Sequence, residues 1–220
     1  MKNKKKNNIP YVFAIILIVA IIFSLIIFYQ SNQQGNLKIV TKEKDVTVFI
    51  DEKNKGFLNT DDKKNGFKIS KGNHSLLLSK DNFWPWIKNF SINGKQTLEV
   101  LPFFVPKNTK GVLIGKTDPE YETIISLIDN NKTRIDWEKT ENTPKIIFDL
   151  ETKITVSDFY KDRSDVIIIA VQDGIYALEI NDELTPNFQP IYKGSNPTFV
   201  KKDNNSIYIK DGGTLMEVFY

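Results

Sequence analysis

The sequence contains no cysteine and only one histidine among its 220 residues. Without cysteine the chain can form neither a disulfide nor a lipid-modified cysteine anchor, so packing and hydrogen bonds must hold its folded parts together. A cysteine–histidine metal site is excluded, and His74 alone offers little material for a Ser-His-Asp triad. The sequence also lacks a glycine-rich phosphate loop and an acidic calcium loop. We therefore expect no catalytic site, cofactor or metal.

The single histidine lies in the stretch "SKGNHSLLLSKDNFWPW", residues 70–86, between a Gly-Asn turn and an apolar run. A lone histidine in such a place is more often a hydrogen-bonded structural residue than a general base. We expect Ser70-Lys71-Gly72-Asn73 to form a tight turn and His74 to begin the next strand.

One long apolar run stands near the start of the chain, from Ile9 to Tyr29. It contains no charge, and only Pro10 and Ser24 interrupt it. A helix of about 20 apolar residues crosses the hydrocarbon core of a bilayer. The preceding residues 1–8, "MKNKKKNN", carry four lysines and no acid, and positive charge stays on the cytoplasmic side. The pattern predicts a basic cytoplasmic tail, a transmembrane helix over 9–29 and an extracytoplasmic remainder.

The alternative for this run is a cleaved secretory signal. A signal peptide has an apolar core of roughly 7–15 residues that ends in a small-x-small cleavage site. The run here is longer, and the following "IIFYQSNQQG" offers no such site. We expect an uncleaved signal-anchor in the plasma membrane, with its N-terminus inside and a polar linker over 30–36.

Charge is unevenly distributed beyond the apolar run. Residues 37–110 contain 14 lysines against 8 acidic residues, whereas residues 111–220 contain 12 basic against 19 acidic residues. The simpler interpretation is solvated faces and attraction between two domains. The alternative is that the basic part contacts anionic lipid head groups or an anionic envelope polymer.

Residues 37–106 alternate between apolar and polar in short stretches, which indicates β-strands. Asn93-Gly94 is the strongest hairpin signal in the chain, and residues 51–56 are typical of a turn. Short strands with turns every 8–12 residues are typical of a small β-sandwich. The strands are expected at 37–41, 46–50, 66–70, 74–80 and on both sides of Asn93-Gly94.

Residues 107–142 form a connector that contains one amphipathic helix, predicted over 119–130. Asp118 is a suitable N-cap, and Pro119 suits the first helical position. A single apolar stripe follows, which predicts that the helix packs on a sheet. The stripe consists of Tyr121, Ile124, Ile125 and Ile128.

The C-terminal region, residues 143–220, contains an internal repeat. Residues 157–180 align without gaps on residues 197–220, at an offset of 40. This offset is close to the ~40–45 residues of a propeller blade, but a closed propeller needs about four blades. We expect an open β-meander of two propeller-blade-like repeats, with the helix covering one face, residues 143–156 adding a hairpin, and the apolar stretch 166–171 as the central strand.

Residues 37–106 also resemble a PEGA domain, a small extracytoplasmic β-sandwich module. The resemblance lies in "VTVFIDEKNKG", "FKISKGNHSLLLSKDNFWPW" and "FSINGKQTLEV". Ser70-Lys71-Gly72-Asn73 stands where that family has Pro-Glu-Gly-Ala, so only the glycine matches. The whole layout is similar to bacterial membrane proteins with one N-terminal helix, a PEGA domain and propeller-like repeats. The resemblance implies an envelope-associated binding unit with no catalytic residues to carry over.

Trp84 and Trp86 lie in the densest aromatic region of the chain. They form a sandwich core or a partly exposed platform for a sugar ring or a partner, and the core is the commoner fate of such residues. In an extended segment both indoles share a face. In the platform interpretation, nearby lysines contact anionic groups. These lysines are Lys71, Lys80 and Lys88.

These features together predict a mainly β, non-enzymatic, single-pass envelope protein. Its expected partners are the bilayer, through residues 9–29, and an anionic polymer, a carbohydrate or an envelope protein outside. We expect no nucleic-acid partner. The alternative is a structural subunit that assembles through the open edges of its β-repeats, and a hydrolase is a third, unsupported by any convergent polar motif.

Overall fold

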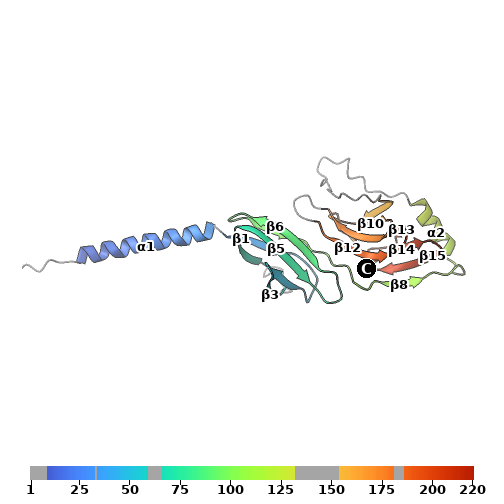
Figure 1. The fold of residues 1–220 in the computed structure, drawn as a ribbon, viewed down its shortest axis with the longest axis horizontal. Coiled ribbons are helices and arrows are strands. Elements are labelled where there is room, and N and C mark those ends of the chain that lie inside the picture. Colours follow the sequence, from blue (N-terminus) through green and yellow to red (C-terminus); the bar gives the residue numbers. More distant parts are fainter. Residues whose placement is uncertain (1–8, 33, 59–65, 132–153, 181–185) are drawn as a thin grey trace, which may run out of the picture. The chain divides into compact units, whose positions relative to one another are not determined.

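The computed structural model describes residues 9–32, 34–58, 66–131, 154–180 and 186–220, with the side chains of 9–15, 27 and 30–32 excepted. Over these residues the chain forms two helices and fifteen strands, so the predicted mainly β class is confirmed (Figure 1). The predicted basic tail over 1–8 and most of the segment 143–156 lie outside the described residues.

The chain divides into two compact units whose segments alternate along the sequence. The first unit consists of Met1–Val40, Asp61–His74 and Ser91–Leu101. The second consists of Thr41–Thr60, Ser75–Phe90 and Pro102–Tyr220. The region predicted as one sandwich, residues 37–106, therefore contributes to both units. All strands of the repeats belong to the second.

The first unit contains a long helix and a three-stranded sheet. Its elements are α1 (Ile9–Asn32), β1 (Gln34–Ile39), β4 (Gly66–Ser70) and β7 (Thr97–Val100). Helix α1 runs three residues past the predicted end at Tyr29, and β1 begins at Gln34. Helix and strand thus take up most of the predicted linker over 30–36. Over the described residues, no helix is both long and apolar enough to cross a membrane.

Strand β1 is the centre of this sheet, which has the order β4-β1-β7. It runs antiparallel to β4 and parallel to β7. Lys38 on β1 faces Glu99 on β7, and their charged groups lie 2.7 Å apart. Both side chains are close to half exposed, so this pair contributes little to stability.

The second sheet contains β2 (Thr47–Ile50), β3 (Lys53–Phe57), β5 (Gly72–Ser79) and β6 (Trp86–Ile92), in the order β3-β2-β5-β6. The turn predicted over 51–56 is confirmed only for its first two residues, and the rest of this stretch is a strand. Asp51 and Glu52 form a tight turn with φ of 50° and 64°, and β3 begins directly after it. Every residue of this edge strand is exposed, so it lacks the apolar alternation that marks a half-buried strand.

The predicted hairpin at Asn93-Gly94 is also wrong. Strand β6 belongs to the sheet of β5, whereas β7 belongs to the sheet of β1. A two-residue hairpin turn needs positive φ at its central residues, but in this stretch only Lys95 has one, at 64°. The amide N–H of Lys95 donates to the carbonyl of Gln34 over 2.7 Å, so the turn after β6 bonds to β1.

The predicted turn at Ser70–Asn73 does not form a hairpin either. Strands β4 and β5 are separated by Lys71 alone and belong to different sheets. Gly72 has a φ of 136°, a value that few other residues adopt. This glycine lets the chain leave one sheet and enter the other, and His74 lies inside β5 rather than at its start.

The C-terminal region forms one helix and two four-stranded antiparallel sheets. The sheet orders are β12-β11-β10-β9 and β13-β14-β15-β8. The elements are β8 (Lys110–Leu113), α2 (Tyr121–Asn130), β9 (Val156–Phe159), β10 (Val166–Val171), β11 (Gly174–Glu179), β12 (Phe188–Lys193), β13 (Thr198–Lys201), β14 (Ser206–Asp211) and β15 (Thr214–Phe219).

Each copy of the internal repeat forms three adjacent antiparallel strands, β9–β11 in the first copy and β13–β15 in the second. Val166 pairs with Glu179 in the first copy, and Ser206 pairs with Phe219 in the second, which is the same register 40 residues later. The two copies do not continue one another in a single sheet, as the expected open meander would. A fourth strand completes each copy: β12 joins the first and β8 joins the second.

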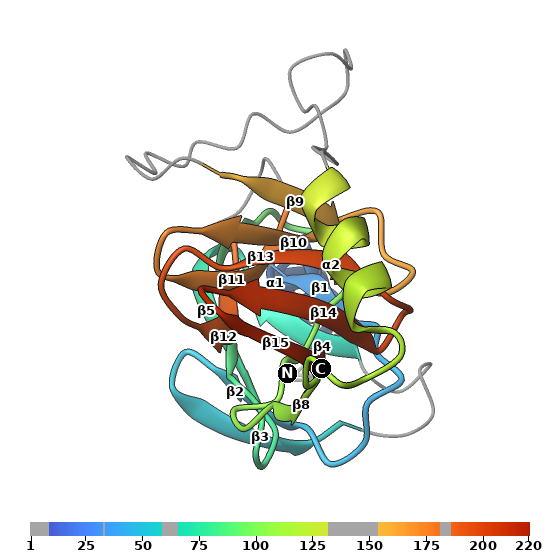
Figure 2. The same ribbon diagram turned by 90° about the vertical axis from the view of Figure 1, so that its right-hand side faces the viewer.

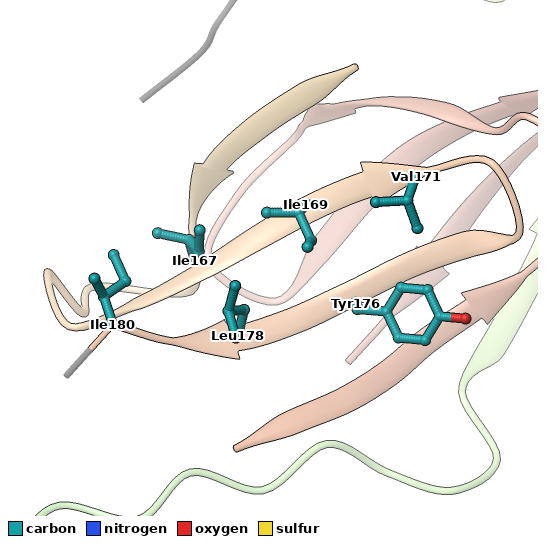
Figure 3. Packing of buried hydrophobic residues seen from close by; sticks show 6 residues of the cluster. All are labelled: Ile167, Ile169, Val171, Tyr176, Leu178 and Ile180. Carbon is teal, nitrogen blue, oxygen red and sulfur yellow. The ribbon is translucent and has the colours of Figure 1, made fainter. Parts of the chain in front are cut away.

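The first repeat is held by a core between its two inner strands. Strand β10 is buried along its whole length, as predicted for the central strand of residues 166–171. Alternate residues of β10 and β11 share one face and pack together (Figure 3). The members of this cluster are Ile167, Ile169, Val171, Tyr176, Leu178 and Ile180.

Helix α2 covers the sheet of the second repeat (Figure 2). Ile124 and Ile128 are buried against Tyr208 and Leu215, with Tyr121 and Ile125 at the edge of the contact, so the predicted stripe is confirmed. The helix begins two residues later than predicted, with Glu120 as its N-cap. The carboxylate of Asp118 accepts a hydrogen bond from the amide of Glu120 over 2.9 Å, and thus caps the turn before the helix.

Strands β11 and β12 approach each other closely at Gly174. A Cβ atom at this position would lie 2.4 Å from the carbonyl oxygen of Tyr192, which is backbone and cannot move alone. We expect Gly174→Ala to lower the free energy of unfolding by about 1–3 kcal/mol, measured by urea unfolding. Gly213→Ala is the control, because a Cβ there meets nothing within 4 Å. Equal stability of the two variants would contradict the close approach.

Candidate functional site

The two tryptophans that the sequence singles out have different environments. Trp86 begins β6 and is fully buried, and Phe90, Phe103 and Phe104 are buried as well. Trp84, two residues earlier, is only partly buried. The platform interpretation therefore does not hold for Trp86, which belongs to the core, whereas Trp84 remains available at the surface.

The three lysines predicted beside these indoles do not form one group. Lys88 is 1% exposed and pairs with Glu179. Lys80 pairs with Glu43, and its ammonium lies 4.3 Å from the ring centre of Phe83. Lys71 is exposed and belongs to the first unit. None of the three lines the grooves beside Trp84.

His74 has a structural contact of the kind expected. Its Nε2 atom lies 2.8 Å from the carbonyl oxygen of Ser70. Over the described residues, no group of three or more His, Asp or Glu side chains is placed to hold a metal ion.

A buried polar cluster joins β6 to the first repeat. The ammonium of Lys88 donates to the carboxylate of Glu179 on β11 over 2.5 Å and lies 5.3 Å from the ring centre of Trp86. Glu179 is 4% exposed and also accepts a hydrogen bond from the side-chain amide of Asn187 over 3.1 Å. Because two charges have been removed from water here, each depends on its partner for compensation.

The side-chain amide of Asn187 completes the edge of β6. It donates to the carbonyl of Ile87 and accepts from the amide N–H of Ile87, both over 2.8 Å. These are the two hydrogen bonds that a neighbouring strand would make. Asn187 therefore takes the place of one residue of a strand at this edge.

Gln189 has a similar role, again through its side-chain amide. Its side-chain oxygen accepts from the amide N–H of Val105 over 2.8 Å, and its nitrogen lies 3.3 Å from the carbonyl of Pro85. Asn187 and Gln189 are both buried. Their amides are used to bind backbone, so these polar groups at β12 fix the segment that carries Trp84.

The first groove beside Trp84 has a volume of 370 Å³ and a mainly apolar lining. Ile87 is 47% exposed and Phe188 39% exposed, and both contribute to it. Phe188 stacks on Tyr176 with ring centres 4.3 Å apart. Burial raises the pKa of Tyr176 to about 12, aided by the hydrogen bond that its hydroxyl donates to Asp173. The full lining is Trp84, Pro85, Ile87, Asn89, Pro186, Asn187, Phe188 and Gln189.

The second groove has a volume of 190 Å³ and carries positive charge. The exposed lysines Lys107 and Lys193 line it, together with Thr109 and Tyr192. The ammonium of Lys107 lies 6.0 Å from the ring centre of Trp84. Burial raises the pKa of Tyr192, with a further contribution from the hydrogen bond that its hydroxyl donates to Asp211.

Trp84 lines both grooves and is the residue that they share. Its Nε1 atom is shielded from solvent and has no hydrogen-bond partner among the described residues. A side chain that is partly exposed while its polar atom is covered presents carbon atoms to solvent. Such a surface suits stacking by a ring better than hydrogen bonding.

Several residues of this site could not be predicted from the sequence. Lys107 and Lys193 come from segments that the sequence does not connect to Trp84. Asn187 and Gln189 occupy alternate positions of "PNFQPIYK", a pattern that resembles the solvated face of a strand. Lys88 did give a signal, since it shares the inward face of β6 with Trp86 and Phe90.

Comparison with protein-family models, with curated proteins and with solved structures finds no match to this chain. The fold therefore defines the class: a mainly β protein with an N-terminal helix and two four-stranded repeat sheets.

Proposed function

We propose that this is a non-enzymatic, single-pass envelope protein of the plasma membrane, whose extracytoplasmic β-domains bind a surface polymer or a protein partner. Residues 9–29 serve as the anchor, with the basic tail inside. Support comes from the absence of charge in this run. Where described, the large apolar side chains of α1 are between 49% (Ile26) and 67% (Tyr29) exposed.

The proposal includes the finer fold. Residues 37–106 form a PEGA-like β-sandwich, which is supported by their seven described strands in two sheets. The repeats at 157–180 and 197–220 are propeller-blade-like, which is supported by a four-stranded antiparallel sheet around each copy.

The observation that carries the binding role is the position of Trp84 between two grooves. Surface aromatic residues beside grooves are common anchors in binding sites. The test is co-sedimentation of the full-length protein, held in detergent micelles, with isolated cell envelope. We expect Trp84→Ala to weaken retention about tenfold, which corresponds to about 1.4 kcal/mol.

Phe57→Ala provides the matched control for this experiment. Phe57 is an aromatic residue on the edge strand β3 that is 72% exposed and does not line either groove. Its loss should leave retention unchanged. No retention of the unaltered protein by any envelope fraction would refute the binding role.

The alternative function is assembly through exposed strand edges. Strand β8 lies at the edge of its sheet, all four of its residues are exposed, and Leu113 is 73% exposed. Edges of this kind invite pairing with another chain. Sedimentation of the same micelles separates the two functions, because a monomer that binds envelope supports the first and an oligomer that does not bind supports the second.

A further inference from the structure

The two grooves beside Trp84 differ in charge, and this difference carries information about the ligand. Among the described residues, the lining of the larger groove includes no charged side chain, and its exposed parts are mainly apolar. Of the residues that the structure describes, two lysines and no acidic residue line the smaller groove. A ligand that filled both would need a neutral, partly apolar body joined to an anionic group.

The lysines of the smaller groove are available for such a group. Neither Lys107 nor Lys193 forms an ion pair among the described residues, whereas Lys80, Lys88 and Lys202 do. Lys107 lies 6.0 Å from the centre of the Trp84 ring, at the outer limit of a cation–π contact. An anion attached to a group stacked on the indole would therefore lie within reach of this ammonium.

The larger groove favours a ring over an extended peptide. Its backbone-binding amides, Asn187 and Gln189, already hold Ile87 and Val105 and the carbonyl of Pro85. At Ile87, therefore, the hydrogen bonds that strand addition would need are already made. What the groove offers instead is the indole of Trp84 and the partly exposed ring of Phe188. Carbon-rich ring faces of this kind suit the apolar face of a sugar.

From this geometry we propose that the site binds an acidic polysaccharide. A neutral sugar ring stacks on Trp84 and extends toward Phe188, and an anionic substituent of the neighbouring sugar lies between Lys107 and Lys193. The substituent is a carboxylate or a phosphate, since both accept hydrogen bonds from ammonium groups. This inference rests on the proposed binding function and names the ligand class of the same site.

The test uses the full-length protein in detergent micelles and isothermal titration calorimetry with defined chains. Hyaluronan oligosaccharides supply sugar carboxylates and a phosphomannan supplies sugar phosphates, so the two arms identify the anion. Dextran is the neutral sugar chain and polyglutamate is the acidic peptide. We expect binding of at least one acidic polysaccharide, and no binding of dextran or polyglutamate.

Variants then locate the binding. We expect Trp84→Ala to weaken binding about tenfold or more because the stacking ring is lost. The double variant Lys107→Met/Lys193→Met should weaken it about tenfold or more because the charge-assisted hydrogen bonds to the anion are lost. Trp84→Phe, which keeps a ring, should retain most of the affinity and guards against a folding defect. The charge-matched control is Lys53→Met/Lys55→Met on exposed strand β3, which should change affinity less than about twofold at 0.15 M salt.

Three results would overturn the inference. Equal losses in the two double-lysine variants would mean non-specific charge attraction. Binding of polyglutamate that depends on Trp84 would assign the site to an acidic peptide. Retention by isolated envelope that no acidic polysaccharide displaces would reject the ligand class while leaving the proposed function intact. These results differ from the one that would refute the proposed binding function, in which isolated envelope does not retain the protein at all.

Discussion

Replacing Glu179 by alanine is expected to lower the free energy of unfolding by about 3–5 kcal/mol. The change removes the carboxylate to which the almost fully buried ammonium of Lys88 is bonded. It also removes an acceptor of the Asn187 side chain, which holds the edge of β6 at Ile87. Urea unfolding of the full-length protein in micelles, followed by tryptophan fluorescence, measures the loss.

Two further variants separate the buried pair from ordinary charge effects. Lys38→Met removes one partner of the exposed Lys38–Glu99 pair and should cost only about 0–1 kcal/mol. The double variant Lys88→Met/Glu179→Leu removes both charged groups and should be more stable than Glu179→Ala alone, because neither member of the pair then remains buried in charged form. A cost below about 1 kcal/mol for Glu179→Ala would show that the pair is not buried in solution.

Replacing Trp86 by alanine is expected to cost about 3–5 kcal/mol, the range for large aromatic residues in a core. Trp86 is fully buried, so its loss would leave a cavity in the core. The substitution would also remove the ring that lies beside the ammonium of Lys88. Trp84→Ala should cost only about 1 kcal/mol, since that side chain is partly exposed. Thermal unfolding of both variants measures the difference.

The pair of variants also tests the assignment of roles. Retention by envelope should be weakened about tenfold in Trp84→Ala at a temperature where the protein is folded. In Trp86→Ala, any loss of binding should follow the loss of folded protein. Equal destabilisation by the two substitutions would contradict the difference in burial.

Elements that depend on local pattern could be predicted from the sequence. The stripe of α2 follows the period of a helix, and β10 is a continuous apolar run. Both patterns depend only on residues that are close in the sequence. The repeat was visible because its two copies preserve spacing as well as residue type. In these cases the information lies within a short stretch of sequence.

Pairing between distant segments could not be predicted in this way. The Asn93-Gly94 signal predicts a turn from two residues, but β7 pairs with β1, some 60 positions earlier in the chain. Trp84 and Trp86 have the same residue type and lie two positions apart. The backbone beside them is held by residues about 100 positions away, since Gln189 bonds to the carbonyl of Pro85 and Asn187 bonds to that of Ile87. A local sequence pattern does not indicate contacts between residues that are so far apart in the chain.

The pairing of β8 with β15 has a consequence for the order in which the protein forms. Leu113 on β8 pairs with Met216 on β15, so the two strands leave the ribosome about 100 residues apart. At a synthesis rate of about 5–20 residues per second, β8 waits roughly 5–20 seconds for its partner. During that interval its exposed Val112 and Leu113 lie on a strand with both edges open. The sheet of the second repeat therefore cannot be completed before β15 has been synthesised, and β8 is exposed to aggregation until then.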